Sequence, residues 1–296
     1  MLNFLPALLI GVVATLLFAA NVLFWPVIVF FLAILKIILP FTPWQRLLDR
    51  ILPKLAENWI SCNSAWMRLF HKTVWDVQGL DNLNYHGWYL VSSNHQSWVD
   101  IFVMQHLLNR RIPLMKFFLK RELIWVPVMG LAWWALDFPF LRRHNGAYLK
   151  KHPAQKGKDF MATRKSCEKF AQNPTSVMNF LEGTRFTGAK HLSQQSPYRH
   201  LLRPKAGGIA LALNVLGEKF YSLLNITIVY PDGIPTFWEF LCGKVRRVTV
   251  RIAQIELPEK FRQGDYEGDQ VFRCEFQQWV QDLWQEKDMQ IQALLQ

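Results

Sequence analysis

The first 35 residues of this chain carry no charged side chain, and this feature constrains the fold more than any other; Lys36 is the first charge. A helix of that length runs roughly 50 Å, whereas the hydrocarbon layer of a bilayer is about 30 Å thick. One straight, perpendicular span is therefore excluded. We expect Asn21 and Pro26 to break the run, which predicts a first segment near 5–24 and a second, shorter one near 27–39.

This apolar run is expected to anchor the chain in a membrane, as one kinked span or as a two-helix hairpin. A cleaved signal peptide is disfavoured because no basic segment precedes the run and because it continues past any cleavage site. Basic residues from Lys36 to Lys54 follow it, and such residues mark the cytoplasmic side of a span. We therefore predict an anchor, residues 1–40, and one α/β domain, residues 41–296, on the cytoplasmic side.

His95 and Asp100 stand at a predicted corner between a strand and a helix. The short aromatic and β-branched run that starts at Trp88 predicts a buried strand, and a helical pattern begins near Asp100. Positions five apart on an ideal helix point about 140° away from each other. The two side chains meet only if His95 precedes the helix. A carboxylate on one imidazole nitrogen fixes the tautomer and makes the other nitrogen a better base.

By itself this spacing is weak evidence for catalysis, because it also arises by chance and because a lone histidine is more often structural than catalytic. A second motif strengthens it. Glu182-Gly183-Thr184-Arg185 follows another strand-like run, residues 176–180. Its glycine permits a sharp turn, and its arginine is a planar, permanently charged group that suits a phosphate.

Together the two motifs, Asn-His-x4-Asp and Glu-Gly-Thr-Arg, resemble the first and third motifs of the glycerophospholipid acyltransferase family, typified by 1-acyl-glycerol-3-phosphate acyltransferase. The resemblance covers roughly residues 77–230 and is closest to the bacterial inner-membrane subgroup called YihG-type. It implies two sets of site residues: catalytic His95 and Asp100 and, for the acceptor phosphate, Arg143, Glu182, Gly183, Thr184 and Arg185.

Two further positions follow from the resemblance. Arg143 matches the arginine of the family's second motif, but Arg142 replaces the usual aspartate, so the customary local partner of Arg143 is missing. Lys205 is a further candidate for contact with an anion. The Pro-Val core of the fourth motif is absent, so no acyl-pocket residue is transferred from it.

The implied reaction is transfer of a fatty acyl group from a thioester to the free hydroxyl of a lysophospholipid, with 1-acyl-sn-glycerol-3-phosphate as the expected acceptor and phosphatidic acid as the product. The donor is acyl-CoA or acyl carrier protein, and no metal or other cofactor is expected. The family's helix pair dips into one leaflet, which favours a hairpin. The implied location is the bacterial inner membrane.

Composition narrows the partners. Residues 110–169 hold fourteen Lys or Arg and four Asp or Glu, a net charge of +10 within a chain of +12. Such a segment suits anionic lipid headgroups or an acidic carrier, and no motif points to nucleic acid. Thirteen tryptophans suit a membrane interface. The four cysteines are scattered, which disfavours a zinc site or a disulfide framework and suits a reducing compartment.

The alternation of apolar runs predicts an α/β fold, with a single mixed sheet flanked by helices and an N-terminal hydrophobic helix pair. The run at 124–134 has two interpretations, a buried core helix kinked at Pro127 or an interfacial element. Expected strands are 74–77, 88–92, 112–118, 176–180, 225–231 and a half-exposed edge strand, 248–252. Expected helices are 44–70 with a break at Pro53, 100–108, 156–172, 209–216 and 269–295, with a mobile loop at 187–200.

Three rival functions remain. A serine hydrolase or thioesterase needs a nucleophile elbow, and the chain has no Gly-x-Ser-x-Gly. A lipid A acyltransferase also carries His-x4-acid behind an anchor, but the Glu-Gly-Thr-Arg motif favours the glycerolipid family. A non-catalytic membrane scaffold has no need for His95 and Asp100 together.

Overall fold

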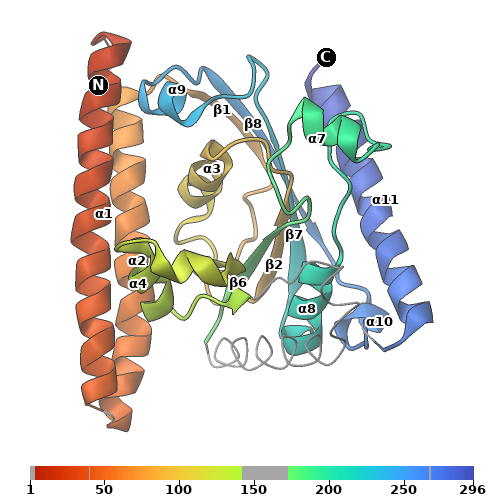
Figure 1. The fold of residues 1–296 in the computed structure, drawn as a ribbon, viewed down its shortest axis with the longest axis horizontal. Coiled ribbons are helices and arrows are strands. Elements are labelled where there is room, and N and C mark those ends of the chain that lie inside the picture. Colours follow the sequence, from red (N-terminus) through yellow and green to blue (C-terminus); the bar gives the residue numbers. More distant parts are fainter. Residues whose placement is uncertain (1–3, 40, 142–172, 267) are drawn as a thin grey trace.

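The computed structural model describes residues 4–39, 41–141, 173–266 and 268–296. Within them, a six-stranded mixed sheet lies between two layers of helices (Figure 1). The α/β class and the single sheet flanked by helices are confirmed; a two-stranded ribbon, β4 (Leu119–Lys120) and β5 (Phe140–Leu141), lies beside the sheet. The strands of the sheet, in spatial order, are β1 (Val74–Gln78), β8 (Arg247–Ile255), β7 (Ser222–Val229), β2 (Tyr89–Ser93), β6 (Ser176–Phe180) and β3 (Met115–Phe117).

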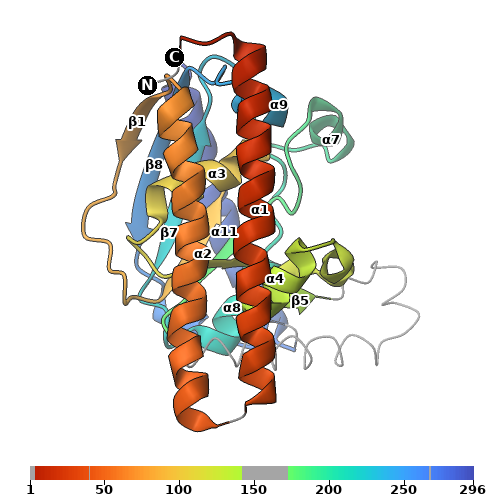
Figure 2. The same ribbon diagram turned by 90° about the vertical axis from the view of Figure 1, so that its left-hand side faces the viewer.

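Each face of the sheet has its own helical layer, because side chains alternate along a strand. Tyr89 and Val91 on β2 point into one core, and Leu90 points into the other. The first core is covered by α1 (Ala7–Ile38), α2 (Thr42–Phe70), α3 (Val99–Leu108) and α9 (Phe237–Leu241). The second is covered by α8 (Gly207–Leu216), α10 (Glu259–Arg262) and α11 (Gln270–Leu294). Figure 2 shows α1 and α2 running side by side along one face.

Strand β2 is central and is parallel to both of its neighbours, β6 and β7. All five of its residues are buried, as expected for a strand covered on both faces. Loops that follow parallel strands gather at one edge of a sheet. The segments after β2 and β6 therefore lie together at the carboxyl edge, and the segments before β2, β3 and β6 lie at the opposite, amino edge.

The predicted break of the N-terminal run at Asn21 and Pro26 is wrong. Helix α1 continues from Ala7 to Ile38 with Pro26 inside it, and it is long and apolar enough to cross a membrane. Asn21 is buried and donates from Nδ2 to Asn63 Oδ1 of α2 at 2.8 Å. This bond and packing along α2 and α4 offset the lost backbone bond at the proline, which costs about 3 kcal/mol in a helix interior.

Helix α2 likewise runs through Pro53 from Thr42 to Phe70, so its predicted interruption is also wrong. Helix α1 ends at Ile38 and α2 begins at Thr42, and the two long helices run side by side in opposite directions (Figure 2). The helix pair thus combines the apolar run with the amphipathic segment after it, and does not arise inside the first 40 residues. Where an anchor ends and a domain begins stays a prediction.

Strand β8 is not the predicted half-exposed edge strand. It pairs with β1 in parallel and with β7 antiparallel, so β1 occupies the edge. The polar residues that alternate along β8 do not mark a face open to solvent. Thr249 is buried, and Arg251 forms an ion pair with Asp76 of β1 at 2.8 Å. A polar side chain with a cross-strand partner is compatible with an inner strand.

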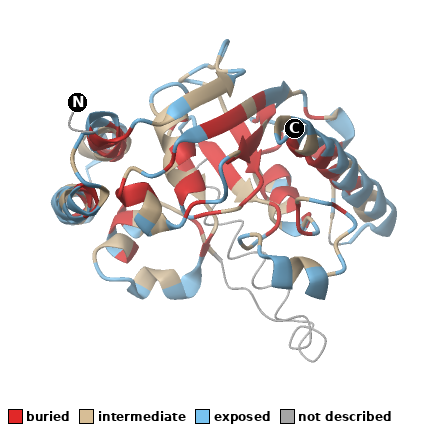
Figure 3. Ribbon diagram, turned by 90° about the horizontal axis from the view of Figure 1, so that it is seen from above, coloured by how far each residue is buried: buried red, intermediate tan, exposed pale blue. Residues whose placement is uncertain are grey.

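The tryptophan-rich run does not form a buried helix. It divides into a 3₁₀ turn, η1 (Arg121–Trp125), and a short helix, α4 (Met129–Ala135). Trp125 is 84% exposed, whereas Ala135 lies in an apolar cluster with residues of α1 and α2. Figure 3 shows the same division over the molecule, with exposed residues on the outer faces of the helices and buried ones along the sheet. Because α4 is held by its alanine face, its larger apolar residues face outward.

Other elements fall close to their predicted places. Strand β6 spans Ser176–Phe180 as expected, and the segment predicted as a loop at 187–200 contains a short helix, α7 (Gly188–Ser193). The predicted helix at 156–172 lies outside the described residues.

Candidate active site

The carboxyl edge of the sheet brings the two sequence motifs together. In the parallel pairing of β2 with β6, Ser93 lies opposite Phe180. His95 and Glu182 each lie two residues beyond that pair, so strand register places them next to each other. The imidazole of His95 stacks on the ring of Phe180, with ring centroids 3.8 Å apart and an interplanar angle of 13°.

His95 and Asp100 are in direct contact. Nδ1 of His95 lies 2.9 Å from Oδ2 of Asp100, and both residues are buried. The backbone N–H groups of Gln96 and Ser97 donate to the same oxygen, at 2.6 and 2.9 Å. The carboxylate therefore closes the turn before α3 as well as holding the imidazole. With a proton on Nδ1, the second nitrogen, Nε2, is left as the base.

Tyr230 is a site residue that sequence reasoning missed. It follows β7, and its hydroxyl donates to Oδ1 of Asp100 at 2.6 Å, from a position 130 residues further along the chain. Burial raises the pKa of this tyrosine well above its ordinary value, with the Asp100 charge adding to the shift. The hydroxyl therefore remains a donor, and both oxygens of Asp100 accept hydrogen bonds. A strand-end tyrosine was the available signal, but no local pattern linked it to Asp100.

Asn94 extends the sheet with its side chain. Its Nδ2 donates to the carbonyl of Ile228 at 2.8 Å, and the N–H of Ile228 donates back to Oδ1 at 2.9 Å. The amide thus takes the place of a backbone group beside β7. This pair of hydrogen bonds explains why an asparagine precedes the histidine, because the pair fixes the point at which the chain leaves the sheet.

Glu182 is fully buried and links the two motifs. Its Oε1 accepts the backbone N–H of His95 at 2.8 Å, and its Oε2 accepts the backbone N–H of Leu202 at 3.0 Å. Burial raises the pKa of Glu182 to about 7, and the two hydrogen bonds oppose that rise. Since the carboxylate bonds backbone groups on both sides, it positions the His95 loop.

The rest of the second motif forms a turn with cationic side chains around it. Gly183 has φ +67°, a conformation that favours glycine, and the Lys205 side chain lies against it. The guanidinium of Arg185 sits 4.6 Å from the ring centroid of Trp98, at the start of α3. Lys190 of α7, which sequence reasoning missed, donates to Thr184 Oγ1 at 2.7 Å. Three cations therefore surround this turn.

One predicted residue, Arg143, lies outside the described residues. The others, His95, Asp100, Glu182, Gly183, Thr184 and Arg185, lie together at the carboxyl edge. No group of three or more His, Cys, Asp or Glu side chains in the described part of the chain is arranged to hold a metal ion.

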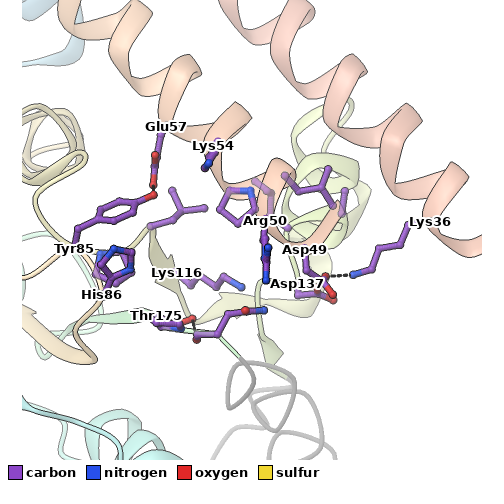
Figure 4. A pocket seen from close by; sticks show the side chains of 18 of the residues that line it. Lys36, Asp49, Arg50, Lys54, Glu57, Tyr85, His86, Lys116, Asp137 and Thr175 are labelled. Carbon is purple, nitrogen blue, oxygen red and sulfur yellow. Dashed lines mark hydrogen bonds and ion pairs between the residues drawn. The ribbon is translucent and has the colours of Figure 1, made fainter. Parts of the chain in front are cut away.

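A second group of charged residues lies at the opposite edge (Figure 4). There a cavity of about 580 Å³, here called the amino-end cavity, opens between α2 and the segments before β2, β3 and β6. Its lining includes Arg50, Glu57, Tyr85, His86 and Thr175. The hydroxyl of Tyr85 donates to Glu57 Oε1 at 2.6 Å. The amino-end cavity is thus separated from His95 by the length of the strands.

The structure has a mixed sheet with a buried His–Asp pair at its carboxyl edge and a Glu-Gly-Thr-Arg turn beside that pair. These features are those expected of an acyltransferase, and comparison with known proteins agrees. The chain belongs to the PlsC-like glycerophospholipid acyltransferase family: the family model described as Acyltransferase matches residues 74–231. The comparisons do not test the YihG-type subgroup, which stays a prediction.

Relatives and a solved structure carry related names. The chain is 23% identical over 264 residues to 1-acyl-sn-glycerol-3-phosphate acyltransferase gamma of Mus musculus, covering 84% of this chain and 61% of that protein. It is 25% identical over 217 residues to 1-acyl-sn-glycerol-3-phosphate acyltransferase 3 of Arabidopsis thaliana, covering 69% and 52%. The chain thus spans little more than half the length of these relatives. The crystal structure of the 1-acyl-sn-glycerophosphate acyltransferase PlsC from Thermotoga maritima shares the fold, with a TM-score of 0.55, 16% identity and coverage of 97% and 96%.

Proposed function

We propose that this protein is a membrane-bound O-acyltransferase. It moves a fatty acyl group from acyl-CoA or acyl carrier protein to the free hydroxyl of a lysophospholipid, with 1-acyl-sn-glycerol-3-phosphate as acceptor and phosphatidic acid as product. The observation that carries this proposal is the 2.9 Å contact between His95 Nδ1 and Asp100 next to the Glu182–Arg185 turn. The names of the relatives support the choice of acceptor.

In the proposed reaction, Nε2 of His95 takes the proton of the acceptor hydroxyl as its oxygen attacks the thioester carbonyl. The carbonyl electrons move to oxygen and then return, and the carbon–sulfur bond breaks. His95 passes the proton to the leaving thiolate, which departs as a free thiol and leaves His95 neutral again. The acceptor oxygen is the nucleophile, so no acyl-enzyme forms. Asp100 orients the imidazole and stabilises its charged form.

The acceptor phosphate is assigned to the cations around the second motif. Arg185 presents a fork of N–H donors that matches phosphate oxygens, and Lys190 and Lys205 add positive charge from α7 and from the segment before α8. Binding of the phosphate holds the acceptor hydroxyl near His95, so the entropy cost of bringing the reacting groups together is met on binding. Arg143 keeps the phosphate role that the family resemblance implies.

Membrane attachment is assigned to the outer face of α1 and to η1–α4. Phe24 and Phe31 of α1 are 57% and 61% exposed, and Trp125 and Leu131 carry the same apolar character onto the neighbouring element. The ring of Trp134 in α4 lies 6.4 Å from that of Phe30 in α1, so the two exposed faces are continuous. Tryptophan is favoured at headgroup depth. This supports the interfacial interpretation of the run at 124–134. That the catalytic domain faces the cytoplasm at a bacterial inner membrane is part of the proposal and follows from the basic residues after the apolar run and from the family resemblance.

One assay tests the function. The purified protein in detergent receives a labelled long-chain acyl thioester with 1-acyl-sn-glycerol-3-phosphate, glycerol-3-phosphate, other lysophospholipids or a lipid A precursor, beside a His95→Ala control. We expect phosphatidic acid from wild type alone. Acylation of the lipid A precursor in its place would contradict the proposed acceptor class. A folded protein that transfers to none of them would support the scaffold alternative. Adding a chelator tests the expectation that no metal is needed.

A further inference from the structure

Trp98 is an exposed tryptophan inside the first motif. It lies between His95 and Asp100 at the start of α3, and 53% of its surface is exposed. The guanidinium of Arg185 lies over its indole, with Cζ 4.6 Å from the ring centroid. A cation within about 6 Å of a ring centroid is attracted by the negative face of the ring, and tryptophan gives the strongest attraction. The two motifs therefore meet through these two side chains.

The backbone around Arg185 is tied to His95. The N–H of His95 donates to Glu182 Oε1 at 2.8 Å, and the carbonyl of His95 accepts the N–H of Phe186 at 2.7 Å. Both backbone groups of the histidine are thus bonded to the segment that carries Arg185. These bonds set the position of the arginine backbone, but a long, flexible side chain can still place its charged end in many ways.

Trp98 is the contact that places this charged end. Lys190 donates to the carbonyl of Arg185 at 3.0 Å, and that bond holds only the backbone. Within the residues that the structure describes, the guanidinium forms no hydrogen bond and no ion pair. A guanidinium binds an aromatic face through its delocalised charge, so its N–H groups stay available for hydrogen bonds. Contact with Trp98 thus orients the arginine without using its donors.

The exposure of Trp98 bears on the alternatives. A tryptophan that serves core packing is largely buried, as Trp284 is, whereas about half of Trp98 is open. The other alternative is a membrane contact, the role assigned above to Trp125. The cation of the second motif over the indole favours a role at the site.

We propose that Trp98 is a positioning residue for the acceptor phosphate, because its indole holds the Arg185 guanidinium beside His95 with the N–H groups open to that phosphate. The base and the phosphate contact then belong to one pair of bonded turns, so their separation is set before the acceptor binds. A group that is already oriented loses less conformational freedom on binding. This inference rests on the proposed function, because it assigns a role in the same reaction.

The test replaces Trp98 with leucine, which removes the aromatic face, and with phenylalanine, which keeps a weaker one. Trp88→Leu is the matched control, because Lys219 lies 5.1 Å from the centroid of the Trp88 ring at the amino edge of the sheet. In Trp98→Leu we expect the acceptor KM to rise roughly fivefold, the effect of one partly exposed cation–π contact, with kcat unchanged. Trp98→Phe gives a smaller rise, and Trp88→Leu keeps both constants at their wild-type values.

A double-mutant cycle connects the effect to the arginine. In the Arg185→Ala background, Trp98→Leu should raise the acceptor KM no further, because the group that Trp98 holds is absent. An equal rise in both backgrounds, or a fall in kcat alone, would overturn the proposal and leave Trp98 a packing residue. A wild-type KM with weaker binding to phosphatidylglycerol vesicles would also overturn it and assign Trp98 to the membrane.

If Trp98→Leu does not fold, NMR of the wild-type protein decides. In ¹⁵N-arginine-labelled protein, with the signal assigned through Arg185→Lys, we expect the ring current of Trp98 to shift the guanidinium protons of Arg185 upfield. A shift equal to that of an exposed arginine would overturn the proposal.

Binding without turnover separates this inference from the proposed reaction. The His95→Ala protein, with and without Trp98→Leu, is titrated with 1-acyl-sn-glycerol-3-phosphate in detergent by calorimetry. Weaker binding on loss of Trp98 supports the inference even where wild type transfers no acyl group, a result that would refute only the proposed reaction. Equal binding by the two proteins would overturn the inference and leave the reaction standing.

Discussion

The two edges of the sheet carry similar side chains in different arrangements. At the carboxyl edge, His95, Asp100 and Tyr230 form one hydrogen-bonded set, in which the carboxylate accepts from both of the other side chains. At the amino edge, His86 and Tyr85 lie in a cavity of about 580 Å³, where Tyr85 donates to Glu57 and the ring of His86 packs against that of Tyr85.

The amino-end cavity therefore does not contain the His95–Asp100 pair. The carboxyl edge has a histidine oriented by a buried acid, because the turn after β2 and the turn after β6 meet there. At the amino edge, Asp49 forms an ion pair with Lys36 and so joins α2 to α1. Glu57 accepts a hydrogen bond from Tyr85 and so joins α2 to the loop before β2. The same residue types stabilise packing at one edge and a reactive geometry at the other. Matched substitutions at the two edges test this difference.

The largest effect is expected from the two histidines. His95→Ala removes the base, and we expect kcat to fall roughly 10³-fold or more, as loss of a general base does. His86→Ala in the amino-end cavity should retain the wild-type rate. Initial rates of phosphatidic acid formation at saturating acceptor distinguish the two. Near-normal turnover in a folded His95→Ala protein would refute the assignment of the base.

The next effect concerns the two aspartates. Asp100→Asn places an amide where the imidazole expects an acceptor, which favours the wrong tautomer, and we expect a loss in kcat of roughly 10³-fold. Asp49→Asn, which removes an ion-pair partner of Lys36 at a partly exposed position, should cost at most about 1 kcal/mol of unfolding free energy. Thermal unfolding and kcat, measured on both variants, give the contrast. Equal kcat values for the two would show that Asp100 does not orient the base.

A smaller effect is expected from the arginines. Arg185→Ala removes a charged partner of the acceptor phosphate, and we expect the acceptor KM to rise roughly thirtyfold, since a hydrogen bond to a charged group contributes about 2 kcal/mol. Arg50→Ala in the amino-end cavity should leave that KM unchanged. Acceptor titrations at fixed thioester concentration provide the test, and an unchanged KM in Arg185→Ala would remove Arg185 from the phosphate site.

The smallest effect on rate is expected from the tyrosines. Tyr230→Phe removes one donor from Asp100 and leaves the others, so we expect kcat to fall roughly fivefold, the contribution of one ordinary hydrogen bond. Tyr85→Phe removes the donor to the buried Glu57 and should lower stability without changing kcat. Denaturant unfolding beside steady-state kinetics separates the outcomes. A larger rate loss in Tyr85→Phe than in Tyr230→Phe would reverse the comparison.

Local sequence pattern predicts the bounds of a strand or helix well where neighbouring residues determine them. Strand β6 was predicted to the residue, and the corner between β2 and α3 was placed within one residue, because short apolar runs and helix starts are encoded by neighbouring positions. The predictions that were wrong depended on distant partners. Pro26 does not break α1 because α2 and α4 pack along it, and β8 is an inner strand because β1 pairs with its outer side.

The sequence alone determined that an acid lies one helical turn beyond a histidine at a strand end, and that a glycine turn with an arginine follows a second strand. Five positions separate His95 from Asp100, so local geometry brings them together. Tertiary structure decided that Glu182 holds the His95 loop and that Tyr230 completes the Asp100 set. Those contacts depend on which strands pair and in which register, and that choice comes from burial of both sheet faces over the whole chain, which no local pattern records.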